Sequence, residues 1–225
     1  MPASAPDQTD DTVLAVESVS RRPQQGRSKA SLERMLSAAQ KLMLERGSED
    51  FTLQEVSKAG NVSIGSIYLR FESKDNLVRA VIASELEQIE RDEDRMIGKV
   101  TAMSHNLDEL VRNYVNAFAE FLRRHAPLLR LSMLRAVDDP LVAEPGKRSA
   151  FRSASIATAA MLEYRDQFGG DDHERRANAA YQVMFATLAR TLSLGSTGES
   201  AHPHDWNELK TELARMCIAY LKHAD

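Results

Sequence analysis

Residues 60–71, GNVSIGSIYLRF, decide how the rest of this sequence is interpreted. A capping box formed by Thr52 and Glu55 predicts a short helix that ends at the glycine opening this stretch. Ser63 is placed to cap a second short helix, and Ser73 to cap a long helix that follows. Two short helices joined by a three-residue turn form a helix-turn-helix arrangement, which predicts a surface able to enter the major groove of DNA.

The second short helix carries residue types that suit contact with base edges. Ile64, Gly65 and Ser66 are compact enough to let the helix start approach the groove closely. Tyr68 and Arg70 add a hydroxyl and a guanidinium that can reach phosphates or a guanine edge. This helix is therefore predicted to read the DNA.

Two helix starts are suited to hold phosphates, because free backbone N–H groups point outward there. Lys74 opens the long helix and adds a positive side chain, and Thr52 opens the first short one. The predicted DNA-binding residues are Thr52, Ser63, Ile64, Gly65, Ser66, Tyr68, Leu69, Arg70 and Lys74. Structural roles stay open for three of them: Tyr68 in the core, Arg70 in a pair with Glu72, and Lys74 as a solvated cap residue.

The remainder of the sequence also has helical periodicity, with no strand alternation and no repeat. Helices of about 17, 7 and 7 residues lead into the long fourth one, and Gly47 ends the first. Later helices are predicted at 107–137 with a break near Pro127, at 151–168, at 174–194 and from Asp205 onward. The last helix has apolar residues at the spacing of helix-against-helix packing, namely Trp206, Leu209, Leu213, Met216 and Tyr220. The predicted fold is all-α.

Composition favours an ordinary globular protein in the cytoplasm. Of 225 residues, 43% are hydrophobic and 28% charged, which is typical of soluble domains. A single cysteine, Cys217, excludes an internal disulfide framework, and we expect it to act as a small buried hydrophobe. We find no apolar run long enough to span a membrane, and the acidic first twenty residues do not resemble a signal peptide.

The charge is distributed unevenly, although the net charge is only −4. Residues 1–20 hold four acids and no base, whereas residues 21–80 hold eleven Lys and Arg against seven Asp and Glu. The rest holds eighteen bases against twenty-two acids. The segment with the helix-turn-helix is thus the basic one, which is where a surface that contacts phosphates would lie.

We divide the chain into three parts. Residues 1–26 are a flexible N-terminal tail, 27–75 a three-helix DNA-binding head, and 76–225 a helical body, for which the family resemblance given next implies ligand binding and dimerisation. The tail ends in Arg21, Arg22 and Arg27, so it is either a solvated leader or a basic arm that touches phosphates.

The run FTLQEVSKAGNVSIGSIYLRFESKDNL, residues 51–77, resembles the N-terminal signature of the TetR family of bacterial transcriptional regulators. Roughly residues 28–82, about a quarter of the chain, carry the likeness. Asn61 and Arg70 depart from the usual pattern, Asn61 in the turn and Arg70 where histidine or tyrosine is frequent. The resemblance implies a homodimer that binds double-stranded DNA at a palindromic operator, most often as a repressor, and is released when an inducer binds in the body.

The body supplies candidates for an inducer pocket, because Met and aromatic residues make adaptable linings for apolar ligands. The candidate lining residues are Met103, Tyr114, Phe118, Phe121, Met133, Met161, Tyr164, Phe168 and Met184. The same residue types belong to a helical core more often than to a pocket, so we expect only a minority of them to line a cavity. We expect an apolar small molecule as the effector, with no cofactor and no metal, since His202 and His204 flank a proline and have no third ligand nearby.

Two other classes of function are weighed against the regulator. An all-α enzyme finds no support, because the sequence shows no nucleophile with its base, no HExxH motif and no Gly-rich phosphate loop. A helical protein-interaction module without DNA binding is the main alternative. Tyr68, Lys74 and the basic balance of residues 21–80 argue against it.

Overall fold

The computed structural model describes residues 26–194 and 205–224, which form eight α-helices and one short 3-10 helix. This part of the chain contains no strand, which confirms the all-α prediction. None of its helices is long and apolar enough to cross a bilayer. The predicted tail up to residue 25 and the His202-Pro203-His204 segment lie outside the described residues.

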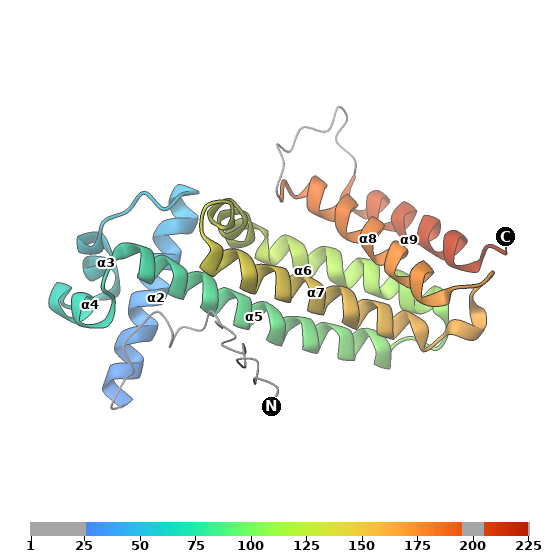
Figure 1. The fold of residues 1–225 in the computed structure, drawn as a ribbon, viewed down its shortest axis with the longest axis horizontal. Coiled ribbons are helices and arrows are strands. Elements are labelled where there is room, and N and C mark those ends of the chain that lie inside the picture. The colour runs from blue at the N-terminus through green and yellow to red at the C-terminus, as the bar shows by residue number, and fades with distance from the viewer. Residues whose placement is uncertain (1–25, 195–204, 225) are drawn as a thin grey trace, which may run out of the picture.

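Three short or medium helices and the start of a long one make up the head (Figure 1). They are α2 (Gly26–Arg46), α3 (Leu53–Gly60), α4 (Ile64–Arg70) and α5 (Lys74–Ala102). The predicted helix starts are confirmed by their caps. The backbone N–H of Glu55 donates to Thr52 Oγ1 over 3.2 Å, that of Ser66 to Ser63 Oγ over 3.0 Å, and that of Asn76 to Ser73 Oγ over 3.1 Å.

The turn between α3 and α4 depends on two adjacent residues for different reasons. Asn61 has φ of 47°, in the left-handed region that asparagine tolerates better than most residues, so the turn accommodates Asn61 between Gly60 and Val62. Gly60 is needed for close packing, because a Cβ there would lie 3.0 Å from the backbone oxygen of Arg34 on α2. Below the turn, Val56, Ile67 and Phe71 are fully buried and form the core of the head.

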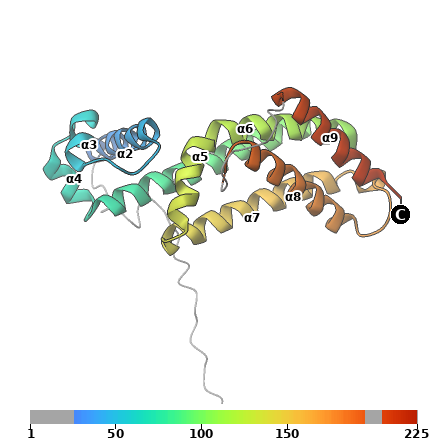
Figure 2. The same cartoon turned by 90° about the horizontal axis from the view of Figure 1, so that it is seen from above.

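The body is a layered bundle in which α5, α6 and α7 run lengthwise beside one another, and α8 and α9 cover one side (Figures 1 and 2). Its elements after α5 are α6 (Leu107–Ala136), α7 (Pro140–Leu162), the 3-10 helix η1 (Arg165–Gln167), α8 (His173–Thr191) and α9 (Trp206–Lys222). Helix α5 starts in the head and continues through the body, across the predicted boundary at 75/76. Any displacement of α5 in the body therefore reaches the head directly.

Three predicted helix limits in the body are wrong, namely the break in α6 and both ends of α7. Helix α6 continues through Pro127, because this proline is exposed and the carbonyl that loses its hydrogen bond, that of Arg123, belongs to an exposed residue as well. Helix α7 begins at Pro140 rather than at residue 151 and ends at Leu162 rather than at 168. Asp139 is its N-cap and Pro140 its first residue, so the predicted stop is also a helix start.

The apolar stripe predicted on the last helix is only partly buried. Leu213 is buried, but Met216 and Tyr220 are 57% and 42% exposed. The residues of α9 that face the bundle are Lys210, Leu213, Ala214, Cys217, Ile218 and Leu221. The helix thus carries two largely exposed apolar side chains outside the face that packs on the bundle, and the guanidinium carbon of Arg176 lies 5.6 Å from the centre of the Tyr220 ring.

Candidate nucleic-acid interface and ligand cavity

Helix α4 presents a continuous outward surface at the far end of the head (Figure 1). Tyr68 is 55% and Leu69 69% exposed, and Gly65 lies one turn before them on the same side. A Cβ added to Gly65 would meet nothing within 4 Å, so neither the backbone nor the fold restricts approach here. In contrast, Ile67 is buried and fixes α4 on the head, which leaves the other face free for a partner.

The hydroxyl groups around α4 already have partners inside the head. Ser63 Oγ and Ser66 Oγ lie 2.7 Å apart. Thr52 Oγ1 donates to Glu55 Oε2 over 3.0 Å, and Glu55 also binds the guanidinium of Arg46. The hydrogen bond from Arg46, followed by those from Thr52, lowers the pKa of Glu55 to about 2. These residues order the reading surface as well as bordering it.

Lys74 has a structural contact that the sequence did not indicate. Its Nζ donates to the backbone oxygen of Glu49 over 2.7 Å and lies 5.0 Å from the centre of the Phe51 ring. The side chain therefore ties the start of α5 to the loop after α2. Arg70 is half-buried at the end of α4, and burial lowers the pKa of its guanidinium.

A cavity of about 430 Å³ lies in the body between α5, α6, α7 and α8, within the range of about 300–1,000 Å³ that is usual for small-molecule sites. Its walls are mostly apolar. They include Ile82, Leu86 and Ile89 from α5, Phe118, Phe121, Leu122, Leu129, Met133, Ala136 and Val137 from or next to α6, Val142 and Ala150 from α7, and Tyr181 and Phe185 from α8. The few polar residues are Ser132, Lys147, Ser149, Ser153 and Tyr181.

The structure brings three of the nine predicted pocket residues into this cavity, namely Phe118, Phe121 and Met133. Met103 lies outside it, 67% exposed at the end of α5. The other five predicted residues also lie outside the lining. Tyr114, Met161 and Met184 are buried in the core, whereas Tyr164 and Phe168 are partly buried near the connection between α7 and α8.

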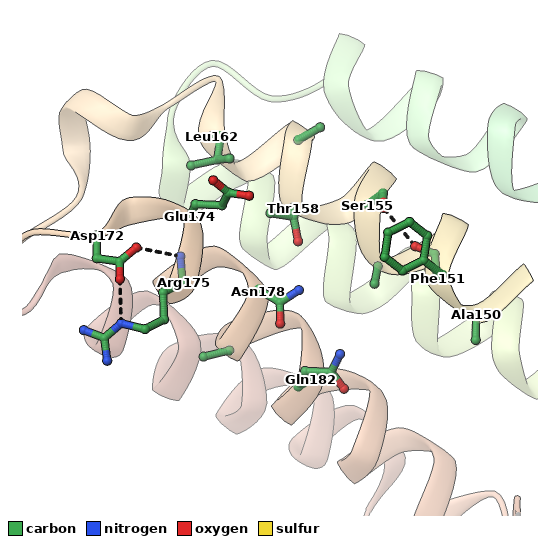
Figure 3. A pocket seen from close by; sticks show the side chains of 13 residues that line it. Ala150, Phe151, Ser155, Thr158, Leu162, Asp172, Glu174, Arg175, Asn178 and Gln182 are labelled. Carbon is green, nitrogen blue, oxygen red and sulfur yellow. Dashed lines mark hydrogen bonds and ion pairs between the residues drawn. The ribbon is translucent and has the colours of Figure 1, made fainter. Parts of the chain in front are cut away.

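A second hollow is an open groove of about 870 Å³ on the outer surface between α7 and α8. Figure 3 shows Phe151, Ser155 and Thr158 from α7 on one side of it and Asn178 and Gln182 from α8 on the other. Its walls carry small and polar side chains, and Phe151 is largely exposed. The groove is thus more polar and more open than the cavity inside the bundle.

Arg135, near the end of α6, is the centre of an ion-pair cluster that joins the body to the head. Its guanidinium lies 2.8 Å from Glu49 of the head, 2.9 Å from Asp75 of α5 and 2.9 Å from Asp139 before α7. Arg79 adds a fourth pair, with its Nε 2.8 Å from Asp139. Although burial alone would raise it, the pKa of Asp139 is lowered by the hydrogen bonds from the two arginines.

A second link between head and body contains the buried His125 of α6. Its Nδ1 lies 2.6 Å from Glu85 Oε1, and its Nε2 lies 3.2 Å from Asp92 Oδ2, both on α5. Glu85 in turn accepts a hydrogen bond of 3.4 Å from Gln40 on α2. The ring of Phe121, which lines the cavity, is centred 4.9 Å from the imidazole. Contacts from Phe121 through His125 and Glu85 to Gln40 therefore connect the cavity wall with α2.

Sequence reasoning did not predict these links, because charged residues in a helical body are usually solvated. The spacing of Arg135 and Asp139, four residues apart, was the one local signal. Their partners Glu49 and Asp75 lie 86 and 60 residues from Arg135, so only the tertiary fold brings them together.

The comparisons with known proteins agree with this geometry. Residues 35–81 match the model of the bacterial regulatory proteins of the tetR family. No match is found among the curated proteins. The matched residues run from the middle of α2 to the start of α5 and include all of α4, so the likeness to the tetR family covers the helix-turn-helix of the head.

Solved structures of regulators share the fold of nearly the whole chain. A protein from Mesorhizobium loti assigned to the TetR family has a TM-score of 0.64 and 17% identity, over 88% of this chain and 96% of that one. A TetR transcription regulator from Haloarcula marismortui has a TM-score of 0.62 and 14% identity, over 86% and 97%. The fatty acid degradation regulator FadR from Bacillus halodurans has a TM-score of 0.59 and 16% identity, over 83% and 97%. The resemblance predicted from residues 51–77 is confirmed, and the chain has the fold of a TetR-family transcriptional regulator.

Proposed function

We propose that this protein is a cytoplasmic transcriptional repressor that binds a palindromic DNA operator as a homodimer and releases it when a small apolar molecule occupies the body. The family match over residues 35–81, with the exposed α4 face inside it, is the observation that carries the proposal. The function has three parts, which are DNA reading, ligand response and dimerisation.

For DNA reading, the exposed face of α4 supplies chemistry that base edges can use. The Tyr68 hydroxyl can bond to a base or phosphate, and the Leu69 side chain can contact a thymine methyl group. Gly65 lets the start of the helix come close to the groove floor. Ser63, Ser66 and Thr52 border this surface and contribute through the helix starts that they cap.

For ligand response, the cavity and the Arg135 cluster share the same turns of α6. Met133, Ala136 and Val137 line the cavity next to Arg135 in sequence, so a ligand that presses on this part of α6 displaces the guanidinium that holds Glu49 and Asp75. The ligand changes DNA affinity by the difference in its own affinity for the two head positions.

For dimerisation, α8 and α9 carry apolar side chains on their outer faces. Val183 of α8 is 52% exposed, and Met216 and Tyr220 of α9 are also largely exposed. The two helices lie side by side at one side of the body (Figure 2). Packing the same pair from a second copy against them buries these residues and places two heads on one duplex, at half-sites about 34 Å apart or a multiple of it.

The test is capture of genomic fragments from the source organism by the purified chain, followed by sequencing and by mass measurement of the complex. We expect an inverted repeat among the captured fragments and two chains on each duplex. Captured fragments without a shared repeat, or one chain per duplex, would contradict the proposal. Specific retention of a protein from the same extract by a head-deleted chain would instead favour an interaction module.

A further inference from the structure

Polar side chains line the cavity at both ends, with Ser132 near the head and two hydroxyl groups at the end that lies away from the head. Near the head, the wall contains Val137 and Val142. Eleven residues further along α7, about 16 Å at 1.5 Å per residue, it contains Ser153, which faces Tyr181 of α8. Ser153 and Tyr181 thus place two hydroxyl groups in this part of the wall.

One helical turn beyond this end lie two more buried polar side chains, Glu93 on α5 and Tyr114 on α6. The ring of Tyr114 stacks on Phe118 of the cavity wall with 5.1 Å between centroids, and Phe118 lies 5.9 Å from the ring of Tyr181. Glu93 is held by Arg152, the neighbour of Ser153 on α7, with 3.1 Å between Nη1 and Oε2. These side chains form one cluster around the far end of the cavity.

The hydroxyl of Tyr114 has no hydrogen-bond partner among the described residues, although it is completely buried. A buried hydroxyl without a partner is unfavourable, because it has lost its bonds to water and gained none. Burial, followed by the nearby Tyr181 and Glu93, raises the pKa of this phenol, so it stays protonated and can both donate and accept.

The charges in the cluster are already balanced. Arg152 Nη1 lies 3.1 Å from Glu93 Oε2, and burial raises the pKa of Glu93 in spite of this pair. A ligand with a carboxylate head would be repelled by Glu93. A ligand with an ammonium head would compete with Arg152, which already neutralises Glu93. Either charge would also lose its hydration in a mostly apolar cavity. An uncharged head group avoids both costs.

We propose that the effector is a mainly apolar molecule with one uncharged hydroxyl or carbonyl head, bound with that head at the Tyr114, Ser153 and Tyr181 cluster. Its hydrocarbon part lies along Phe118 and Phe121 toward Val137. This inference rests on the proposed function and names the chemical class of its ligand. Lys147, at the cavity rim, would be the anchor for an acid instead, but it is paired with Glu144 over 2.6 Å.

The test is a calorimetric titration of the full-length protein with three probes that have the same chain and different heads, namely decanol, decanoate and decylammonium. We expect decanol to bind more tightly than either charged probe by at least about tenfold. Decanoate or decylammonium binding as tightly as decanol would overturn the inference.

A pair of variants locates the head group. Tyr114→Phe should weaken decanol binding by about five- to tenfold, because one hydrogen bond is lost. Tyr164→Phe is the matched control, since the Tyr164 hydroxyl already donates to the Ser104 oxygen over 2.8 Å, unlike the unpartnered Tyr114 hydroxyl, and it should leave decanol binding unchanged. Tyr114→Phe keeps the stacked ring, so its helix content by circular dichroism should equal that of the parent.

The outcomes separate this inference from the proposed function. If Tyr114→Phe binds decanol as the parent does, the assigned head position is wrong. If decanoate binds best and releases DNA, the ligand response stands and only the uncharged head fails. If none of the three probes binds, the apolar ligand and this inference fail together, while DNA capture still tests the regulator.

Discussion

Gly60 and Gly65 lie five residues apart in the head and meet different demands. Gly60 is where α3 touches α2, with a Cβ position 3.0 Å from a backbone oxygen and 3.3 Å from Ala38 Cβ. Gly65 has open space around the Cβ position and ordinary helical surroundings. One glycine therefore serves packing, and the other serves access to the surface of α4.

Alanine substitutions should separate these two roles. Gly60→Ala should lower the free energy of unfolding by about 1–3 kcal/mol, because backbone must shift to admit the methyl group. Gly65→Ala should leave stability equal or raise it by up to about 1 kcal/mol, since alanine favours helix, and yet weaken operator binding. Urea unfolding and fluorescence anisotropy measure the two quantities. Unchanged operator affinity in a stable Gly65→Ala protein would remove α4 from the interface.

The capping box predicts a response to acid. Because hydrogen bonds from Arg46 and Thr52 hold the pKa of Glu55 at about 2 in the folded head, against an ordinary value of 4.5, the stability that Glu55 contributes is complete above pH 4.5. It is lost as the pH falls from there through about 2. The loss of stability over this range should be smaller in Glu55→Gln than in the parent, as measured by urea unfolding at each pH. Equal losses would mean that the box does not persist in solution.

At the scale of the helices, the sequence predicts what is local and misses what depends on neighbours. The capping serines and Thr52 place the starts of α3, α4 and α5 correctly, since each bond spans three residues. Pro127 was predicted to break α6, and only its exposed position explains why the helix continues. The cavity lining could not be predicted from the sequence either. Phe118 lines the cavity, whereas Met161 and Met184 lie in the core, and the sequence does not distinguish these apolar side chains.

Arg135 joins α6 to the head by ion pairs with Glu49 and Asp75. Substitution of Arg135 tests whether these ion pairs transmit the ligand response. Arg135→Met should lower the free energy of unfolding by about 2–4 kcal/mol, because three carboxylates lose their shared partner. It should also reduce the effect of a cavity ligand on operator affinity. Arg112→Met on the same helix is the control, since its exposed pair with Asp108 spans 3.8 Å and is worth at most about 1 kcal/mol. Full ligand-induced release in a folded Arg135→Met protein would exclude this route.

At the scale of the whole molecule, the proposed dimer rests on apolar side chains of α9 that the bundle leaves exposed. Leu213, Cys217 and Leu221 pack inside the bundle, and burial raises the pKa of the Cys217 thiol to about 11. Met216 and Tyr220 are largely exposed on α9, as is Val183 on α8. The periodicity of the sequence identified this helix as a packing element, but it could not show which face packs against a second copy.

A charge placed on the outer face should separate the subunits. Met216→Asp should give a monomer with intact helices and much weaker operator binding, because burying an unpaired carboxylate in an apolar interface is unfavourable. Leu134→Asp, an equally exposed apolar site at the head end of α6, should remain a dimer. Sedimentation equilibrium reports the mass of each variant. A dimeric Met216→Asp protein would place the interface elsewhere.

The central claim is that the outer face of α4, presented twice by a dimer, reads a specific DNA sequence. Its most direct test is selection of bound duplexes from a random pool by the parent protein and by the Tyr68→Ala, Leu69→Ala double variant, read by sequencing. Both residues are exposed, so the variant should fold and dimerise as the parent does. We predict that the parent enriches an inverted repeat and that the variant does not. The same repeat enriched equally by both proteins would contradict the claim.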